Sequence, residues 1–152
     1  MKFNHLYFLI VLFSLAFIFS CSETAKLQKL QKSFIPQTLP NIYIGMTLKD
    51  LEAQRGMSKL SVVERDIITI VKEEYNKDSI ALIQYQFAKD KKLYEVIIEY
   101  VPEVNANANF LAKFGAFNNG TEWAFTLDKS LKLKIWTYQN RLCIADSKHF
   151  KN

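Results

Sequence analysis

The chain has 152 residues, enough for one domain with terminal extensions. Its hydrophobic fraction of 49% is ordinary for a globular protein and excludes a chain that is disordered throughout. The formal net charge is +5, but the basic residues are mostly Lys and are spread along the sequence. Because a nucleic-acid-binding surface usually needs a cluster that includes Arg, we expect no nucleic-acid partner.

The first twenty residues have the pattern of a secretion signal. Lys2 supplies a positive charge, and an apolar run from Leu6 to Phe19 follows it. This run is shorter than the ~20 residues that span a bilayer. It therefore favours a cleaved signal peptide over residues 1–20 rather than a transmembrane helix.

The junction Ile18-Phe19-Ser20-Cys21 resembles the lipobox of bacterial lipoproteins. Those signals end in an aliphatic residue, a small residue, then Gly, Ala or Ser, and finally Cys; only Phe19 departs from the pattern. The resemblance implies cleavage between Ser20 and Cys21, a diacylglycerol thioether on the Cys21 sulfur, and a fatty acid such as palmitate on its new amine. Two or more acyl chains anchor a protein stably to a membrane. The alternatives are ordinary signal-peptidase cleavage and an uncleaved anchor helix.

The residue after Cys21 indicates the membrane in which the protein is located. In well-studied diderm bacteria an Asp after the lipidated Cys favours inner-membrane retention, so Ser22 indicates the outer membrane. We expect a lipid-anchored envelope protein that faces the periplasm or the cell surface. With Cys21 acylated, Cys143 is left without a disulfide partner, and its apolar neighbours predict a buried thiol.

We expect residues 21–40 to form the lipidated N-terminus and a flexible tether. The stretch is polar at its start, and Pro36 and Pro40 interrupt any helix. A single folded domain is then predicted over 41–148, with a polar tail at 149–152.

The domain shows two predicted helices and several alternating stretches. Thr47 and Asp50 form a capping pattern for a short helix that Gly56 would end. Residues 62–74 are rich in β-branched side chains and favour a strand, although their spacing also fits a helix. The strict alternation over 80–88 and 93–101, across a polar tip at 89–92, predicts an antiparallel hairpin. Tyr85 and Phe87 share one face of the first strand; in the second strand Tyr94, Val96 and Ile98 face one way and Glu95 the other.

A second helix is predicted at 110–114, followed by strands at 122–127, 131–136 and 142–145. The expected fold class is therefore α+β, with an antiparallel sheet of about five to six strands packed with two short helices. Leu51–Gly56 and Leu111–Gly115 are loosely similar, which is consistent with two tandem helix-plus-three-strand units.

Ile44-Gly45-Met46-Thr47, followed by Asp50-Leu51, resembles the helix-opening motif of small lipoproteins of the BamE/SmpA type and of the related β-lactamase-inhibitor-protein-like fold. The resemblance implies a lipid-tethered α+β domain and a role as an accessory of outer-membrane β-barrel assembly. The sequence departs from that group in lacking a Pro after Gly56.

Residues for catalysis or for a cofactor are sparse. His149 is the one histidine after the signal segment, the glycines are isolated, and no His/Cys cluster has metal-ligand spacing. Glu95 and Glu99 lie ~13 Å apart along one strand, too far for a paired acid and base. We therefore expect no catalytic residues, no metal, no cofactor and no enzyme activity.

Aromatic side chains are the remaining candidates for function. Trp136 and Tyr138 would share a strand face with Lys132 and Lys134, opposite the apolar residues of 131–135. Such aromatic and basic faces are common at protein interfaces, although pairing within the sheet is the simpler interpretation. The sequence thus favours a non-catalytic interaction module that binds an envelope protein. A BamE-like accessory is a special case of that function, and an envelope enzyme or small-ligand carrier is the alternative from another class.

Overall fold

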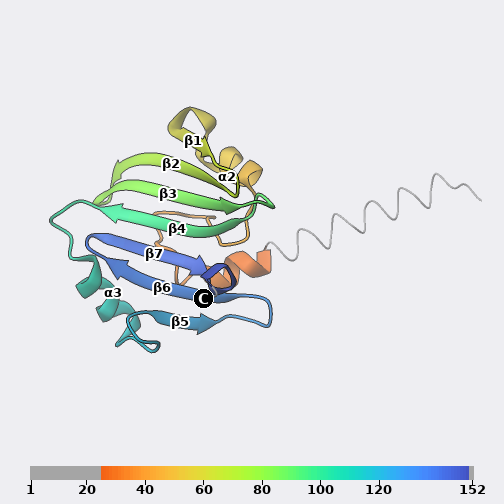
Figure 1. Ribbon diagram of the computed structural model, residues 1–152. Helices are drawn as coiled ribbons and strands as arrows, with labels where there is room; N and C mark the ends of the chain where they lie inside the picture. Colours follow the sequence, from red (N-terminus) through yellow and green to blue (C-terminus); the bar gives the residue numbers. More distant parts are fainter. Residues whose placement is uncertain (1–24, 151–152) are drawn as a thin grey trace, which may run out of the picture.

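The computed structural model describes residues 25–150 and shows one seven-stranded antiparallel sheet, with strand order β1-β2-β3-β4-β7-β6-β5 (Figure 1). The strands are β1 (Leu60–Glu64), β2 (Ile68–Lys77), β3 (Ile80–Ala88), β4 (Leu93–Tyr100), β5 (Trp123–Thr126), β6 (Lys132–Tyr138) and β7 (Arg141–Asp146). The helical elements are residues 25–31, α2 (Leu48–Arg55), α3 (Ala106–Phe114) and the 3-10 turns η1 (Met57–Lys59) and η2 (Ser147–Phe150).

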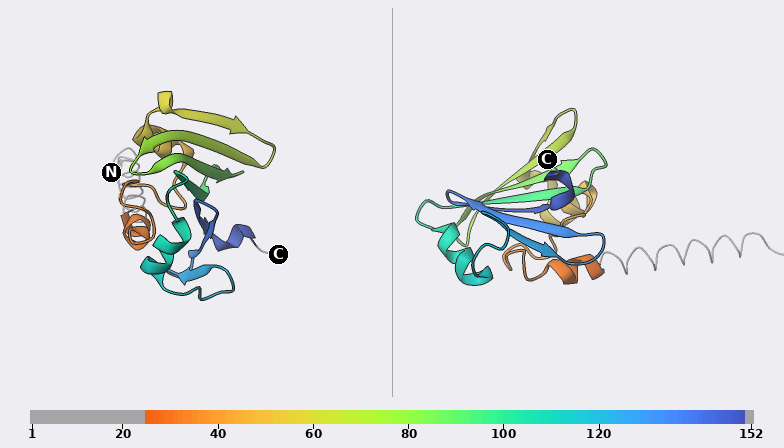
Figure 2. Two further views of the ribbon diagram at one scale, coloured as in Figure 1. Left: turned by 90° about the vertical axis from the view of Figure 1, so that its left-hand side faces the viewer. Right: turned by 60° about the horizontal axis from the view of Figure 1, so that its bottom comes forward.

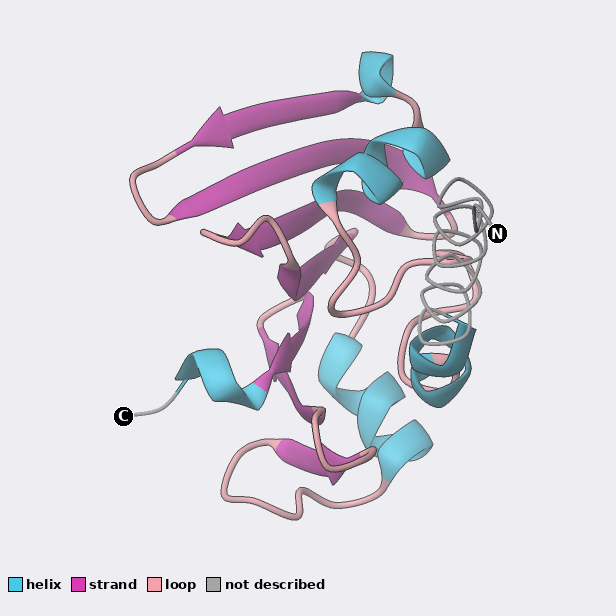
Figure 3. Cartoon of the chain, turned by 90° about the vertical axis from the view of Figure 1, so that its right-hand side faces the viewer, coloured by secondary structure: helices cyan, strands magenta, loops and turns pink. Residues whose placement is uncertain are grey.

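The predicted α+β class is confirmed, with one more strand than the five to six expected. Residues 62–74 are the reason, because the turn at 65–67 divides this β-branched stretch between β1 and β2. Residues 25–31, α2 and α3 lie on one side of the sheet, and η2 lies on the other (Figure 3). We call the side without α2 and α3 the open face.

The strand order is compatible with two tandem units. α2 precedes β2, β3 and β4, and α3 precedes β5, β6 and β7; each unit runs from an outer strand to the middle of the sheet. The units meet where β4 pairs with β7, from Glu95 opposite Ala145 to Glu99 opposite Arg141. β1 is an additional edge strand of the first unit, and Figure 2 shows the two halves twisted relative to each other.

Local sequence signals account for the helix ends. The Thr47 hydroxyl accepts a hydrogen bond from the Asp50 backbone N–H, the Asp50 carboxylate accepts one from the Thr47 N–H, and Gly56 ends α2 with a φ of 80°. α3 begins four residues earlier than predicted, at Ala106, because the Asn105 side chain caps it by accepting a hydrogen bond from a backbone N–H.

The core lies between the sheet and the helices, and its largest fully buried side chains include Trp123, Tyr85 and Phe87. The predicted inward direction of Val96 and Ile98 is confirmed, but that of Tyr94 is wrong. A register shift between Gln86 and Phe87 turns Tyr94 to the open face, where its hydroxyl donates a hydrogen bond to Gln86 Oε1 at 2.7 Å.

The segment expected to be a tether is instead part of the fold from residue 25 onward. Gln31 is fully buried; its Nε2 donates to the Ile44 carbonyl at 3.0 Å and its Oε1 accepts from the Ile44 N–H at 2.7 Å. Ile35 and Leu39 are buried in the same core. The Gln31 side chain pairs with the backbone of a distant residue, and the polar composition of this stretch gives no sign of such a contact.

The predicted signal segment 1–20 and Cys21 lie outside the described residues. Within 25–150 no helix is both long and apolar enough to cross a membrane.

The expected polar tail also belongs to the domain as far as residue 150. η2 packs on the open face, with the His149 ring centroid 4.8 Å from that of Tyr94 and the Phe150 centroid 5.5 Å from that of Trp136. The domain described here therefore begins before residue 41 and ends after residue 148.

A buried ion pair joins α2 to the sheet. Arg55 Nε and Nη2 donate to the two carboxylate oxygens of Glu73 on β2 at 2.9 and 2.7 Å, and the Tyr85 hydroxyl donates to Glu73 Oε2 at 3.0 Å. The Arg55 guanidinium also lies 5.3 Å from the centroid of the Tyr75 ring. The hydrogen bond with Glu73 raises the pKa of Arg55, and burial together with the Glu73 charge raises that of Tyr85. This cluster holds α2 in place.

Candidate functional site

The open face is the candidate site because the covered face is filled by the core. The β6 side chains point alternately to the two sides of the sheet. Leu133 and Ile135 are fully buried on the core side, so the residues that alternate with them point to the open face. The structure accordingly brings together on the open face the four residues singled out from sequence, namely Lys132, Lys134, Trp136 and Tyr138.

The four residues differ in accessibility. Tyr138 is 60% exposed, and Lys132 is exposed as well. Trp136 is half-buried because the Phe150 ring packs edge-on against it. Lys134 is held by an ion pair, with its Nζ 3.0 Å from Glu122 Oε2. Tyr138 and Lys132 are therefore available to a partner, whereas η2 partly covers the residues between them.

The strand register extends this face with residues that sequence reasoning did not select. Beside Tyr138 lie Arg141 and Glu99, joined by an ion pair with 2.8 Å between Arg141 Nε and Glu99 Oε2. Beside Trp136 lie Cys143 and Ile97, which give the centre of the face an apolar floor. Arg141 lies between the strands predicted at 131–136 and 142–145, so its pairing with Glu99 was not predicted.

Glu95 is the unusual charged group of this face. It is 6% exposed, next to Gln86 on one side and Ala145 on the other, and within residues 25–150 no hydrogen-bond donor or cation is paired with its carboxylate. Burial raises its pKa to about 7.

The prediction that Cys143 is buried is confirmed, and burial with the nearby Glu95 charge raises the pKa of its thiol to about 12. Cys143 is therefore a protonated, unreactive thiol at neutral pH.

Replacing Glu95 with Gln should stabilise the protein at alkaline pH. The folded protein holds a proton on Glu95 that the unfolded chain has released, so ionisation of this group reduces stability as the pH rises from about 4.5 to about 7. Glu95→Gln should match the wild type near pH 4 and exceed it at pH 8 by on the order of 3 kcal/mol. Urea unfolding at both pH values measures the difference.

The matched control for this substitution is Glu99→Gln, on the same strand and the same face. Glu99 has Arg141 as a partner, so its neutralisation should give no gain in stability at pH 8. Equal stability of Glu95→Gln and wild type at pH 8 would show that the carboxylate is not desolvated.

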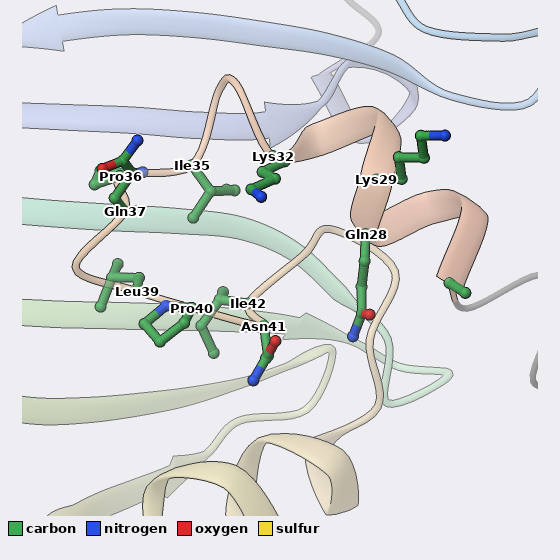
Figure 4. Close-up of a pocket in the computed structure, with 11 residues that line it drawn as sticks. Gln28, Lys29, Lys32, Ile35, Pro36, Gln37, Leu39, Pro40, Asn41 and Ile42 are labelled. Atoms are coloured by element: carbon green, nitrogen blue, oxygen red, sulfur yellow. The ribbon is translucent and has the colours of Figure 1, made fainter.

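A separate pocket of about 520 Å³ lies between the helical residues 25–31 and the loop at 35–42. In Figure 4 Gln28 extends from the helix toward the loop, whereas Lys29 points away. The described lining is mostly apolar, and its charged side chains are Lys29 and Lys32.

No protein-family model matches the chain, and comparison with curated proteins and with solved structures also finds no match. Among the described residues, no three His, Cys, Asp or Glu side chains are grouped so that they could hold a metal ion.

Proposed function

We propose that this protein is a lipid-anchored, non-catalytic module of the cell envelope that binds a protein partner through the open face of its sheet. The anchor is the acylated Cys21, for which the support is the lipobox-like junction. The binding face is centred on β6 and β7, and the observation that carries it is the 60% exposure of Tyr138 beside Arg141 and the apolar floor.

The chemistry of this face suits a protein rather than a small molecule. Tyr, Trp and Arg are enriched where protein partners bind, because each buries a large area and keeps a polar group for a directed contact. Tyr138 and Arg141 are neighbours at one side of the face, and Lys132 adds a positive charge at the far end of β6. A partner would therefore present apolar and acidic groups to this surface.

A photo-crosslinking amino acid in place of Tyr138 tests the proposal in intact cells. It should give one discrete adduct with an envelope protein, and Lys132→Glu in the same chain should weaken that adduct. The control places the same amino acid at Lys49, an exposed residue of α2 on the other side of the sheet, and should not give this adduct. Capture of a component of outer-membrane barrel assembly would identify the narrower BamE-like role.

Two results would contradict the proposal. One is the absence of any adduct specific to position 138 when the protein is folded and localised normally. The other is an adduct that forms equally from positions 138 and 49, because binding would then not be specific to the open face.

A further inference from the structure

We propose that one end of the sheet lies directly on an anionic bilayer surface. This inference depends on the proposed lipid anchor at Cys21 and goes beyond it by assigning the surface that the membrane contacts. The surface, which we call the basic end, consists of the turns 65–67, 89–92 and 127–131 together with η2.

Only a short stretch of chain separates the proposed anchor from the fold. Leu27 is the first described residue that packs against the core, and Lys26 Nζ lies 3.2 Å from Asp128 Oδ2 in the turn after β5. Only residues 22–26 separate Cys21 from Leu27. At ~3.6 Å per residue this connection reaches about 22 Å at most. A domain held so closely contacts or nearly contacts the bilayer.

The strand register identifies the end of the sheet that lies nearest the proposed anchor. Ile68 pairs with Ala88 and Thr126 with Lys132, so the three turns lie at the same end of the sheet. An ion pair of 2.7 Å between Lys91 and Glu64 joins the first two turns. The Lys26–Asp128 contact places the start of the helical segment 25–31 at this end, on the right-hand side of Figure 1.

The two ends of the sheet differ in charge. The connections at the basic end contain six Lys or Arg and three Asp or Glu. The basic residues are Arg65, Lys89, Lys91, Lys92, Lys129 and Lys148. The connections at the opposite end, residues 56–59, 78–79, 101–105, 115–122 and 139–140, contain one Lys and three acidic residues. The end nearest the anchor is therefore the positive one.

The basic end also carries an exposed apolar residue at a turn. Ile67 is 72% exposed between Asp66 and the start of β2. A basic surface with an apolar tip matches a bilayer with anionic headgroups, to which each Lys or Arg near the surface adds on the order of fivefold in affinity. This attraction falls off within a Debye length of about 8 Å, so it acts only because the connection to Cys21 is short. With the basic end on the bilayer, the strands run away from the membrane surface, so the open face stays accessible to a partner.

Site-directed spin labels on the acylated protein test this contact. The purified lipidated protein carries a label at Ile67→Cys or, for comparison, at Glu103→Cys at the opposite end; Cys143 is buried and protonated and does not compete for label. The proteins are reconstituted in phosphatidylcholine vesicles with and without phosphatidylglycerol. In anionic vesicles the label at 67 should be several-fold less accessible to a water-soluble relaxation agent than the label at 103.

Charge-reversal variants separate attraction from simple tethering. Lys89→Glu with Lys92→Glu should restore several-fold greater water accessibility at position 67, whereas Lys59→Glu with Lys77→Glu, the same charge change at the opposite end, should not. Equal water accessibility at 67 and 103, or equal shielding in neutral vesicles, would overturn the inference while the anchor stands. Mass spectrometry that shows an unmodified Cys21 would instead overturn the anchor and this inference with it.

Discussion

Replacing Arg55 with Ala should lower the free energy of unfolding by about 3–5 kcal/mol. Glu73 is buried, and Arg55 supplies two of the hydrogen bonds that its carboxylate accepts, at 2.9 and 2.7 Å. Without Arg55 the carboxylate stays in a poorly solvated site with only the Tyr85 hydroxyl as a partner. Urea denaturation of wild type and variant at neutral pH measures the loss.

Arg141→Ala is the matched control because it removes an Arg from an exposed ion pair. The Arg141 and Glu99 side chains are 43% and 30% exposed, against 14% and 4% for Arg55 and Glu73. Its loss should stay below about 1 kcal/mol. The double variant Arg55→Met with Glu73→Gln removes both charges, keeps an acceptor for the Tyr85 hydroxyl and should recover most of the stability that Arg55→Ala loses. Equal losses for the two single Arg variants would refute the assignment of the buried pair as the device that holds α2.

The second large effect is expected at Cys21. Cys21→Ala should abolish labelling with a fatty acid and release the protein from the membrane fraction. Two or more acyl chains hold a protein stably, whereas a basic surface without them is displaced by salt. Fractionation in high salt together with metabolic labelling measures both outcomes.

Cys143→Ala controls for a general effect of losing a thiol and should leave labelling and fractionation unchanged, because the Cys143 thiol is buried and unreactive. If Cys21→Ala loses the label but stays in the membrane, an uncleaved anchor helix holds the protein. If both the label and the fractionation are unchanged, Cys21 is not the lipid site.

Elements whose pattern is local could be predicted from the sequence. The alternation around Tyr85 and Ile98 set the hairpin of β3 and β4, and Thr47 with Asp50 set the start of α2. The exception within the hairpin is Tyr94. One irregular step in the register moved it to the other face, and an alternating pattern carries no sign of such a step.

Features that depend on distant partners could not be predicted. Gln31 lies in a polar stretch, and nothing in its neighbours indicates that its side chain pairs with the Ile44 backbone. Arg55 and Glu73 likewise form their pair across 18 positions of sequence. For the open face, alternation sufficed to group Trp136 with Tyr138, but the cover that Phe150 places over Trp136 depends on how the chain end folds back.

Binding of a protein partner to the open face is tested most directly by the affinity of the captured partner for Tyr138→Ala. A tyrosine that anchors an interface commonly contributes about 2 kcal/mol or more, so the dissociation constant should rise about thirtyfold relative to wild type. The matched substitution Lys49→Ala, on α2 at the other side of the sheet, should leave it unchanged. An unaltered dissociation constant for Tyr138→Ala, with the fold intact, would contradict the account.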